Sequence, residues 1–100
     1  MNKTSEQVVQ WASDKGLVDN STWEAQYVKL TEEKDELMVA LMAKDLDSIE
    51  DELGDCLVVL TVVAAQHGLT IEQCYKRAYN KISKRKGKTI NGIFVKESDL

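Results

Sequence analysis

Two pairs of carboxylates stand out in this 100-residue sequence because each pair has helical spacing. Glu33 and Glu36 are three residues apart, and so are Glu52 and Asp55, which places the members of each pair one above the other on a helix. Glu33 also falls within the apolar face of its own segment, where an unpaired carboxylate is costly. Glu32 continues this strip of acids outward. Two helices packed antiparallel through their apolar faces would bring the two pairs together.

A bound divalent cation is the chemistry that such a convergence indicates. Like charges about 4 Å apart repel by roughly 4 kcal/mol at an effective dielectric constant of 20, so converging acids need a compensating positive charge. Ligation by oxygen favours Mg²⁺ or Mn²⁺ over zinc. Because Mg²⁺ held by a few carboxylates usually completes its shell with waters and substrate phosphates, a phosphate-bearing ligand is expected.

The acids and the bases are segregated along the chain. Eleven of the 17 acidic residues lie between positions 24 and 55, whereas seven of the 13 basic residues lie between positions 76 and 88. Lys81 and Arg85 border the apolar stripe of the last helical segment, one turn apart, which suits a polyphosphate. The alternative is that both clusters are simply solvated surface charges.

Four helices are expected to position these side chains. Their caps, apolar spacing and glycine stops place them at about residues 4–15, 22–43, 48–66 and 70–86. The expected caps are a capping box of Ser21 with Glu24, then Asp47 or Ser48, and a second capping box of Thr70 with Gln73.

Composition favours an all-α fold in a single domain over residues 1–100, because the chain has no proline, only five glycines and 43% hydrophobic residues. The third segment is apolar all round in its last three turns and must be covered on every side. The protomer is therefore expected to resemble a four-helix bundle that assembles through its helices into a homodimer or homotetramer. After Gly87 a short non-helical tail is expected. In it, Asn91-Gly92 would form a tight turn, either of a hairpin or of a tail clipped onto a neighbouring subunit.

Charge and hydropathy disfavour several classes of function. The net charge of −4 argues against a general nucleic-acid binder. The longest apolar run, residues 56–65, has about half the length needed to cross a bilayer, and the start of the chain is polar rather than like a signal peptide, so a cytoplasmic protein with no membrane partner is expected. Cys56 and Cys74 are expected to be reduced and structural. His67, as a lone histidine, gives no support to a nucleophilic dyad.

Three motifs of the chain, taken together, match a known pattern. They are "EExxEL" at residues 32–37, "ELGD" at 52–55, and a basic "NKxxxR" formed by Asn80, Lys81 and Arg85. Their order and separation resemble the MazG-like nucleotide pyrophosphohydrolases of the all-α NTP pyrophosphatase superfamily. The C-terminal ending is similar to that of the short, single-domain members, several of which are phage-encoded.

The resemblance implies Mg²⁺-dependent hydrolysis of an NTP or dNTP to the monophosphate and pyrophosphate by a metal-activated water, with Mn²⁺ as a possible substitute. The implied metal ligands are Glu33, Glu36, Glu52 and Asp55, with Glu32 assisting a ligand or the attacking water, and the implied phosphate-binding residues are Asn80, Lys81 and Arg85.

Four aromatic residues are candidates for stacking on the base: Trp11, Trp23, Tyr27 and Tyr79. Trp23 and Tyr27 fall on the core face of the second helix, which favours a structural role for them. Trp11 is therefore the preferred base-binding residue.

Two alternatives remain open at this stage. A non-catalytic helical interaction protein would use its acidic patch to bind a basic partner, and its acids should then point to polar faces, whereas Glu33 and Glu52 are expected on buried sides. An enzyme that acts on non-nucleotide or modified nucleotide pyrophosphates would carry the same motifs.

Overall fold

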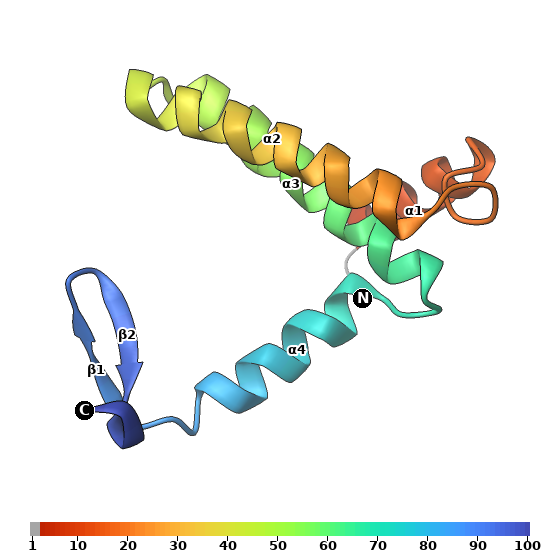
Figure 1. The fold of residues 1–100 in the computed structure, drawn as a ribbon. Helices are drawn as coiled ribbons and strands as arrows, with labels where there is room; N and C mark the ends of the chain where they lie inside the picture. Colours follow the sequence, from red (N-terminus) through yellow and green to blue (C-terminus); the bar gives the residue numbers. More distant parts are fainter. Residues whose placement is uncertain (1–2) are drawn as a thin grey trace.

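The structure of the protein is a computed structural model, and it describes residues 3–100. The chain is predominantly helical, as predicted, with a small two-stranded sheet near its C-terminal end (Figure 1). Its elements are α1 (Lys3–Asp14), α2 (Trp23–Ala43), α3 (Leu46–Gln66), α4 (Ile71–Ile82), β1 (Gly87–Ile90), β2 (Ile93–Lys96) and the 3-10 turn η1 (Glu97–Asp99).

The two longest helices, α2 and α3, lie side by side and antiparallel (Figure 1). A very short connection makes this possible, because Lys44 ends α2 in the left-handed region (φ 55°) and donates its backbone N–H to the carbonyls of Ala40 and Leu41. Asp45 then caps α3, and its carboxylate accepts from both the backbone N–H and the hydroxyl of Ser48. The predicted cap at Asp47 or Ser48 is thus wrong, since α3 begins before both.

Of the two predicted capping boxes, the one at the start of α2 is wrong and the one at the start of α4 is confirmed. Thr22, and not the predicted Ser21, caps α2 by accepting a hydrogen bond from the backbone N–H of Ala25 at 3.2 Å. Two adjacent hydroxyl residues offered equivalent cap chemistry, and only the chain direction at the helix start decides between them. The predicted capping box of Thr70 with Gln73 at the start of α4 is confirmed.

The core is small and is built on α3. Its buried apolar side chains are Ala12 of α1, Ala40 of α2, and Val59, Val62 and Ala64 of α3. The amide of Gln66 also donates to the Leu17 carbonyl at 2.9 Å, which ties the end of α3 to the loop after α1. The third helix is therefore central, and α1, α2 and α4 all contact it.

The last helix leaves this core instead of completing a bundle. α4 contacts α3 but runs away from the α2–α3 pair, and the strands stand at its far end (Figure 1). The radius of gyration is 16.0 Å, compared with about 13 Å for a compact domain of this length. The predicted bundle-like protomer is therefore only partly formed, because the fourth helix is splayed outward.

The C-terminal tail forms the hairpin that was one of its two predicted arrangements. Strands β1 and β2 pair antiparallel, with Gly87 opposite Lys96 and Ile90 opposite Ile93. Asn91 (φ 52°) and Gly92 (φ 80°) make the tight turn, since both positions of such a turn need positive φ.

Two further observations concern exposed apolar residues. Trp23 and Tyr27 are 53% and 63% exposed, so their predicted place in the core is wrong for a single chain, although their rings contact each other edge to face. Among residues 3–100, no single helix has the length and apolar character to cross a membrane. The α3–α4 pair, bent by 100°, meets those criteria only when both helices are taken together.

Candidate functional site

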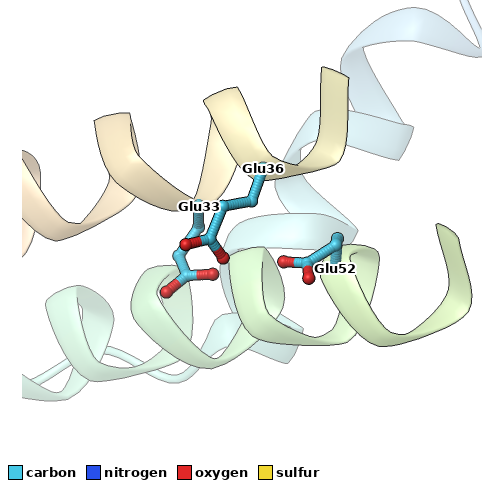
Figure 2. Close-up of side chains that lie close together, drawn as sticks. All are labelled: Glu33, Glu36 and Glu52. Atoms are coloured by element: carbon cyan, nitrogen blue, oxygen red, sulfur yellow. The ribbon is translucent and has the colours of Figure 1, made fainter. Parts of the chain in front are cut away.

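Three of the four predicted metal ligands converge between α2 and α3. Figure 2 shows Glu33 and Glu36 reaching from α2 and Glu52 from α3, with their carboxylates turned toward one another. One carboxylate oxygen from each lies within 4.8 Å of the others. Two antiparallel helices, each with acids three residues apart, thus produce the convergence that their spacing predicted. We call these three residues the acid cluster.

The fourth predicted ligand joins the cluster through α3. Asp51, Glu52 and Asp55 also have carboxylate oxygens within 4.8 Å of one another, so Glu52 belongs to both groups. Asp51 is not among the residues predicted from the motifs. Its position four residues before Asp55 could have revealed it, because that spacing places the two side chains on one face of the helix.

Burial makes the acid cluster costly without a cation. Glu33 is only 5% exposed, and its Oε2 atom is buried with no hydrogen-bond partner among the residues that the structure describes. The Oε2 atom of Glu52 is in the same state. An unsatisfied buried oxygen, above all one that carries charge, is strongly unfavourable. A cation coordinated by these oxygens would satisfy both, so the residues present fit a divalent metal.

The electrostatics of the site favour the uptake of positive charge. Burial first, and then the nearby Glu36 carboxylate, raise the pKa of Glu52 above its usual range. Burial likewise raises the pKa of Asp55, with help from the charges of Asp51 and Glu33, while Lys29 opposes the shift. Carboxylates that resist ionisation in this way gain most from a bound cation.

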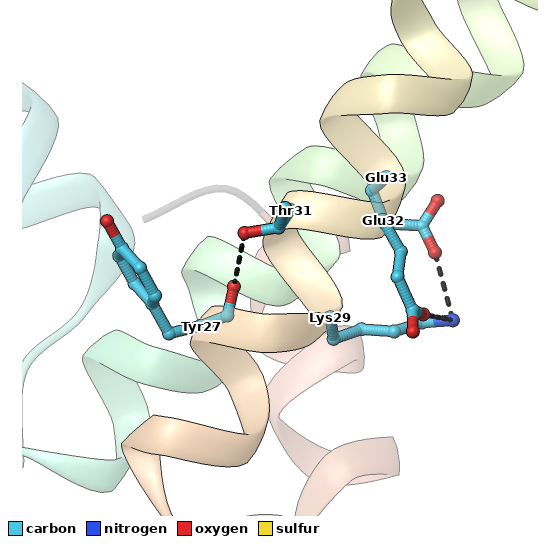
Figure 3. Close-up of polar contacts among 5 residues, drawn as sticks. All are labelled: Tyr27, Lys29, Thr31, Glu32 and Glu33. Atoms are coloured by element: carbon cyan, nitrogen blue, oxygen red, sulfur yellow. Dashed lines mark hydrogen bonds and ion pairs between the residues drawn. The ribbon is translucent and has the colours of Figure 1, made fainter.

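Lys29 is the cation closest to the cluster in the part of the chain that the structure describes. Its Nζ lies 3.1 Å from Oε1 of Glu33 and 3.6 Å from Oε2 of Glu32 (Figure 3). The hydrogen bond to Glu33 and the charge of that residue raise the pKa of Lys29. Lys29 and Glu33 lie one turn apart on α2. Beside them, the Thr31 hydroxyl donates a hydrogen bond to the Tyr27 carbonyl at 3.2 Å (Figure 3).

A cavity of about 1080 Å³ opens between α1, α3 and α4, next to the acids. Asp51 and Asp55 line it on the α3 side, and Val8, Ile71 and Tyr75 supply apolar lining from α1 and α4. Pockets for small ligands typically hold about 300–1,000 Å³. The space is therefore sufficient for a small ligand, and Asp51 and Asp55 line it whereas the three residues of the acid cluster do not.

The predicted phosphate-binding residues do not approach the acids within one chain. Asn80, Lys81 and Arg85 are all exposed, and the end of α4 points away from the α2–α3 pair (Figure 1). Arg85 lies beyond the end of α4 at Ile82, so its predicted place on a helix that continues to residue 86 is wrong.

Two other predictions concern single side chains. Trp11 is 49% exposed on α1 and does not line the large cavity, so its predicted contact with a base has no support from this cavity. Cys56 and Cys74 are free and partly buried, in agreement with their predicted reduced state. Burial, followed by the charge of Glu33, raises the pKa of Cys56, which disfavours a nucleophilic thiolate.

The fold and the acid cluster place the chain in a class of small helical proteins in which carboxylates from two antiparallel helices face one another. Cation sites in helical cores are built in this way. The profile of the MazG nucleotide pyrophosphohydrolase domain matches residues 22–90, a stretch that includes α2, α3, α4 and β1. The chain belongs to the MazG nucleotide pyrophosphohydrolase family, as its motifs predicted. Proteins of this family are typically metal-dependent.

One curated relative comes from a phage. The chain is 42% identical over 60 residues to the "uncharacterized 18.2 kDa protein in rep-hol intergenic region" of Haemophilus phage HP1. This match covers 60% of the present chain and 37% of that protein, so it spans little more than a third of the relative's length. The source agrees with the predicted phage-type character. No solved structure matches the chain.

Proposed function

We propose that the chain is a Mg²⁺-dependent nucleoside triphosphate pyrophosphohydrolase that converts an NTP or dNTP to the monophosphate and pyrophosphate. One observation carries this proposal: Glu33 and Glu52, which belong to one cluster between α2 and α3, each have a buried carboxylate oxygen without a hydrogen-bond partner among residues 3–100. The adjoining cavity is lined by Asp51 and Asp55, which are grouped with Glu52 on α3, and would admit a polyphosphate beside the cluster.

The proposed roles follow from the position of each side chain. Glu33, Glu36 and Glu52 would hold the metal together with Asp55, which is grouped with Glu52, and the bound metal would supply charge screening and lower the pKa of a water. Glu32 is exposed and lies 3.6 Å from Lys29, at the rim of the cluster, where it can assist a ligand or take a proton from the attacking water.

The bond changes require no covalent intermediate on the protein. One water adds its oxygen to the α-phosphorus, and the bond from that phosphorus to the bridging oxygen breaks. Pyrophosphate leaves with the bonding electron pair, and the proton of the water passes to a carboxylate or to solvent. The chain's own contribution is to fix the acids in place and to present the cavity, because positioning and electrostatics dominate such reactions.

Two alternatives predict different results. A non-catalytic protein that binds a basic partner through an acidic patch has no reason to bury its acids, and the 5% exposure of Glu33 counts against it. Hydrolysis of modified nucleotides or non-nucleotide pyrophosphates uses the same cluster and differs only in what occupies the cavity.

The test is the release of pyrophosphate from a panel of NTPs and dNTPs in Mg²⁺ or Mn²⁺, with products resolved by ³¹P NMR. We expect pyrophosphate and monophosphate in equal amounts from at least one nucleotide, and loss of that activity in Glu52→Gln. Asp35→Asn is the matched control, because Asp35 lies on α2 but is exposed and pairs with Lys34. Absence of hydrolysis throughout, or full activity of Glu52→Gln, would refute the proposal.

We further propose that the protein works as a homodimer or homotetramer. The chain exposes large apolar side chains on three of its helices, including Met38 and Val39 of α2, Leu53 and Leu57 of α3, and Tyr75 and Tyr79 of α4. Soluble monomers rarely leave so much apolar surface uncovered. A two-stranded hairpin that stands alone is also marginally stable in water.

Assembly would also explain the position of the basic residues. A second copy, packed on the open side of α3, can bring its own Asn80, Lys81 and Arg85 toward the acids, where they would bind phosphates. Light scattering coupled to size-exclusion chromatography tests the assembly, with a dimer or tetramer as the expected result. A monomer at micromolar concentration that is fully active would contradict it.

A further inference from the structure

Lys29 holds one oxygen of the buried Glu33 carboxylate. Its Nζ lies 3.1 Å from Glu33 Oε1, while Oε2 is buried and has no hydrogen-bond partner among residues 3–100, and the carboxylate belongs to the acid cluster. The two oxygens of Glu33 therefore have different environments. Oε1 pairs with an ammonium group on its own helix (Figure 3), Oε2 is buried, and the carboxylate as a whole turns toward Glu36 and Glu52 (Figure 2).

The lysine approaches from outside the cluster. Its side chain is 53% exposed, whereas that of Glu33 is 7% exposed, so the ammonium reaches inward from the surface of α2. It also contacts Glu32, one residue before Glu33, at 3.6 Å. Lys29 is thus held by two acids of the motif and leaves the inner oxygen of Glu33 open.

We propose that Lys29 is a positioning residue for the metal: by fixing Oε1, it aligns the Glu33 carboxylate so that Oε2 faces the ion. This inference rests on the proposed metal site. Ligating carboxylates are commonly fixed by a hydrogen-bond donor behind them, and loss of such a donor typically weakens metal affinity by about 10–100-fold. A substitution at Lys29 therefore affects the ion through Glu33.

The opposite role makes the opposite prediction. If Lys29 merely occupied the cation position until a metal displaced it, its removal would strengthen metal binding. The two free oxygens, Glu33 Oε2 and Glu52 Oε2, argue against this competition, because Lys29 leaves both of them unsatisfied. The sign of the change in metal affinity separates the two roles.

The experiment measures Mn²⁺ binding to the nucleotide-free protein by electron paramagnetic resonance, which reports the free ion. Lys29→Met keeps much of the apolar stem and removes the charge. We expect its dissociation constant for Mn²⁺ to rise about 10–100-fold, while Lys29→Arg, which can still donate to Oε1, stays within about 10-fold of the parent. Lys34→Met is the matched control, because Lys34 lies on the same helix and pairs only with the exposed Asp35.

Thermal unfolding followed by circular dichroism in chelator confirms that each variant is folded. Unchanged or tighter Mn²⁺ binding by Lys29→Met would overturn the role of Lys29 and leave the proposed function standing. Weakened binding by Lys34→Met to the same degree would also overturn it, since the effect would then be one of general charge. If the parent binds no Mn²⁺, the metal site and the role of Lys29 fail together.

Discussion

The antiparallel pair α2–α3 and the segment of residues 71–100, which we call the arm, differ in both packing and charge. The pair contains seven of the eight buried residues described, among them Glu33, and the acid cluster lies between its helices. The arm has no buried residue, and it carries eight of the 13 basic residues but only three of the 17 acidic ones.

This difference follows from what each charge has to do. Acids that bind a metal must be fixed close together against their own repulsion, which requires a packed support. Cations that bind phosphate from the opposite side can extend to it on long, flexible side chains, so they depend less on a packed support. Under the proposed function, a single chain would contain the acidic half of a phosphate site, which we call the rigid half, and would present the basic half on an arm directed away from it (Figure 1).

The largest effect is expected from a change in the rigid half. Glu36→Gln removes one cluster carboxylate at an exposed position of α2, so folding should be preserved. Because loss of a residue that only supports a metal ligand already costs about 10–100-fold, loss of a ligand should lower kcat/KM for pyrophosphate release by at least about 100-fold. Steady-state kinetics in saturating Mg²⁺ measure it, beside the exposed Asp35→Asn. A loss below 3-fold would remove Glu36 from the site.

The arm should show a smaller effect of a different kind. Lys81→Met removes one proposed phosphate contact, and a hydrogen bond to a charged group is worth about 1.5–3 kcal/mol, or about 10–100-fold in affinity. We expect KM for the nucleotide to rise by at least about 10-fold while kcat changes little. Lys96→Met, in β2 of the same arm, is the control. A fall in kcat at constant KM would show that Lys81 acts on the reaction itself.

Sequence reasoning predicted the rigid half better than the arm. The inward position of Glu33 and the convergence with Glu52 follow from helical periodicity, because α2 and α3 are long and strongly patterned. The cap of α3 at Asp45 was harder to predict, since Asp45, Asp47 and Ser48 all offer cap oxygens within four residues.

The end of α4 and the direction of the arm escaped prediction, each for a physical reason. In a continued helix, Lys81 and Arg85 would be like charges four residues apart, which is destabilising, and α4 ends between them at Ile82. The direction of the arm depends on the angle at the turn between α3 and α4, which no periodicity in the sequence specifies. Lys29 is an intermediate case, because its spacing to Glu33 is visible in the sequence but the burial of Glu33 Oε2 is a property of the fold.

A third prediction tests whether the hairpin of the arm takes part in assembly. A Cβ atom on Gly87 would collide with the Val95 carbonyl oxygen and lie 2.8 Å from the Phe94 ring, so Gly87→Val should break the pairing of β1 with β2. We expect weaker association, by several-fold in the concentration at which dimers dissociate, with unchanged helix content by circular dichroism. Gly92→Asn is the control, since asparagine tolerates the positive φ of that turn. Equal association of parent and Gly87→Val would exclude the hairpin from the interface.

The smallest effect concerns the pH dependence of stability in the metal-free protein. Burial and neighbouring acids raise the pKa of Glu52 and Asp55 in the folded state. The folded protein then binds these protons more tightly than the unfolded chain, so stability falls as the pH rises from the usual carboxyl range through the raised pKa values. Asp45 has the opposite sign, because hydrogen bonds from Ser48 lower its pKa, and its stabilisation is lost only as the pH falls below that range.

These signs predict that the melting temperature of the metal-free protein declines as the pH rises through the raised pKa values of Glu52 and Asp55. Glu52→Gln should reduce this decline in melting temperature, since one of the two responsible carboxyls no longer ionises. Saturating Mg²⁺ should reduce the decline in the parent protein by neutralising both carboxylates. Thermal melts from pH 4 to 8, with and without the metal, measure the two effects. A melting temperature that rises toward neutral pH in chelator would mean that Lys29 already compensates the acid cluster, and the rigid half would then have no need of a cation from outside.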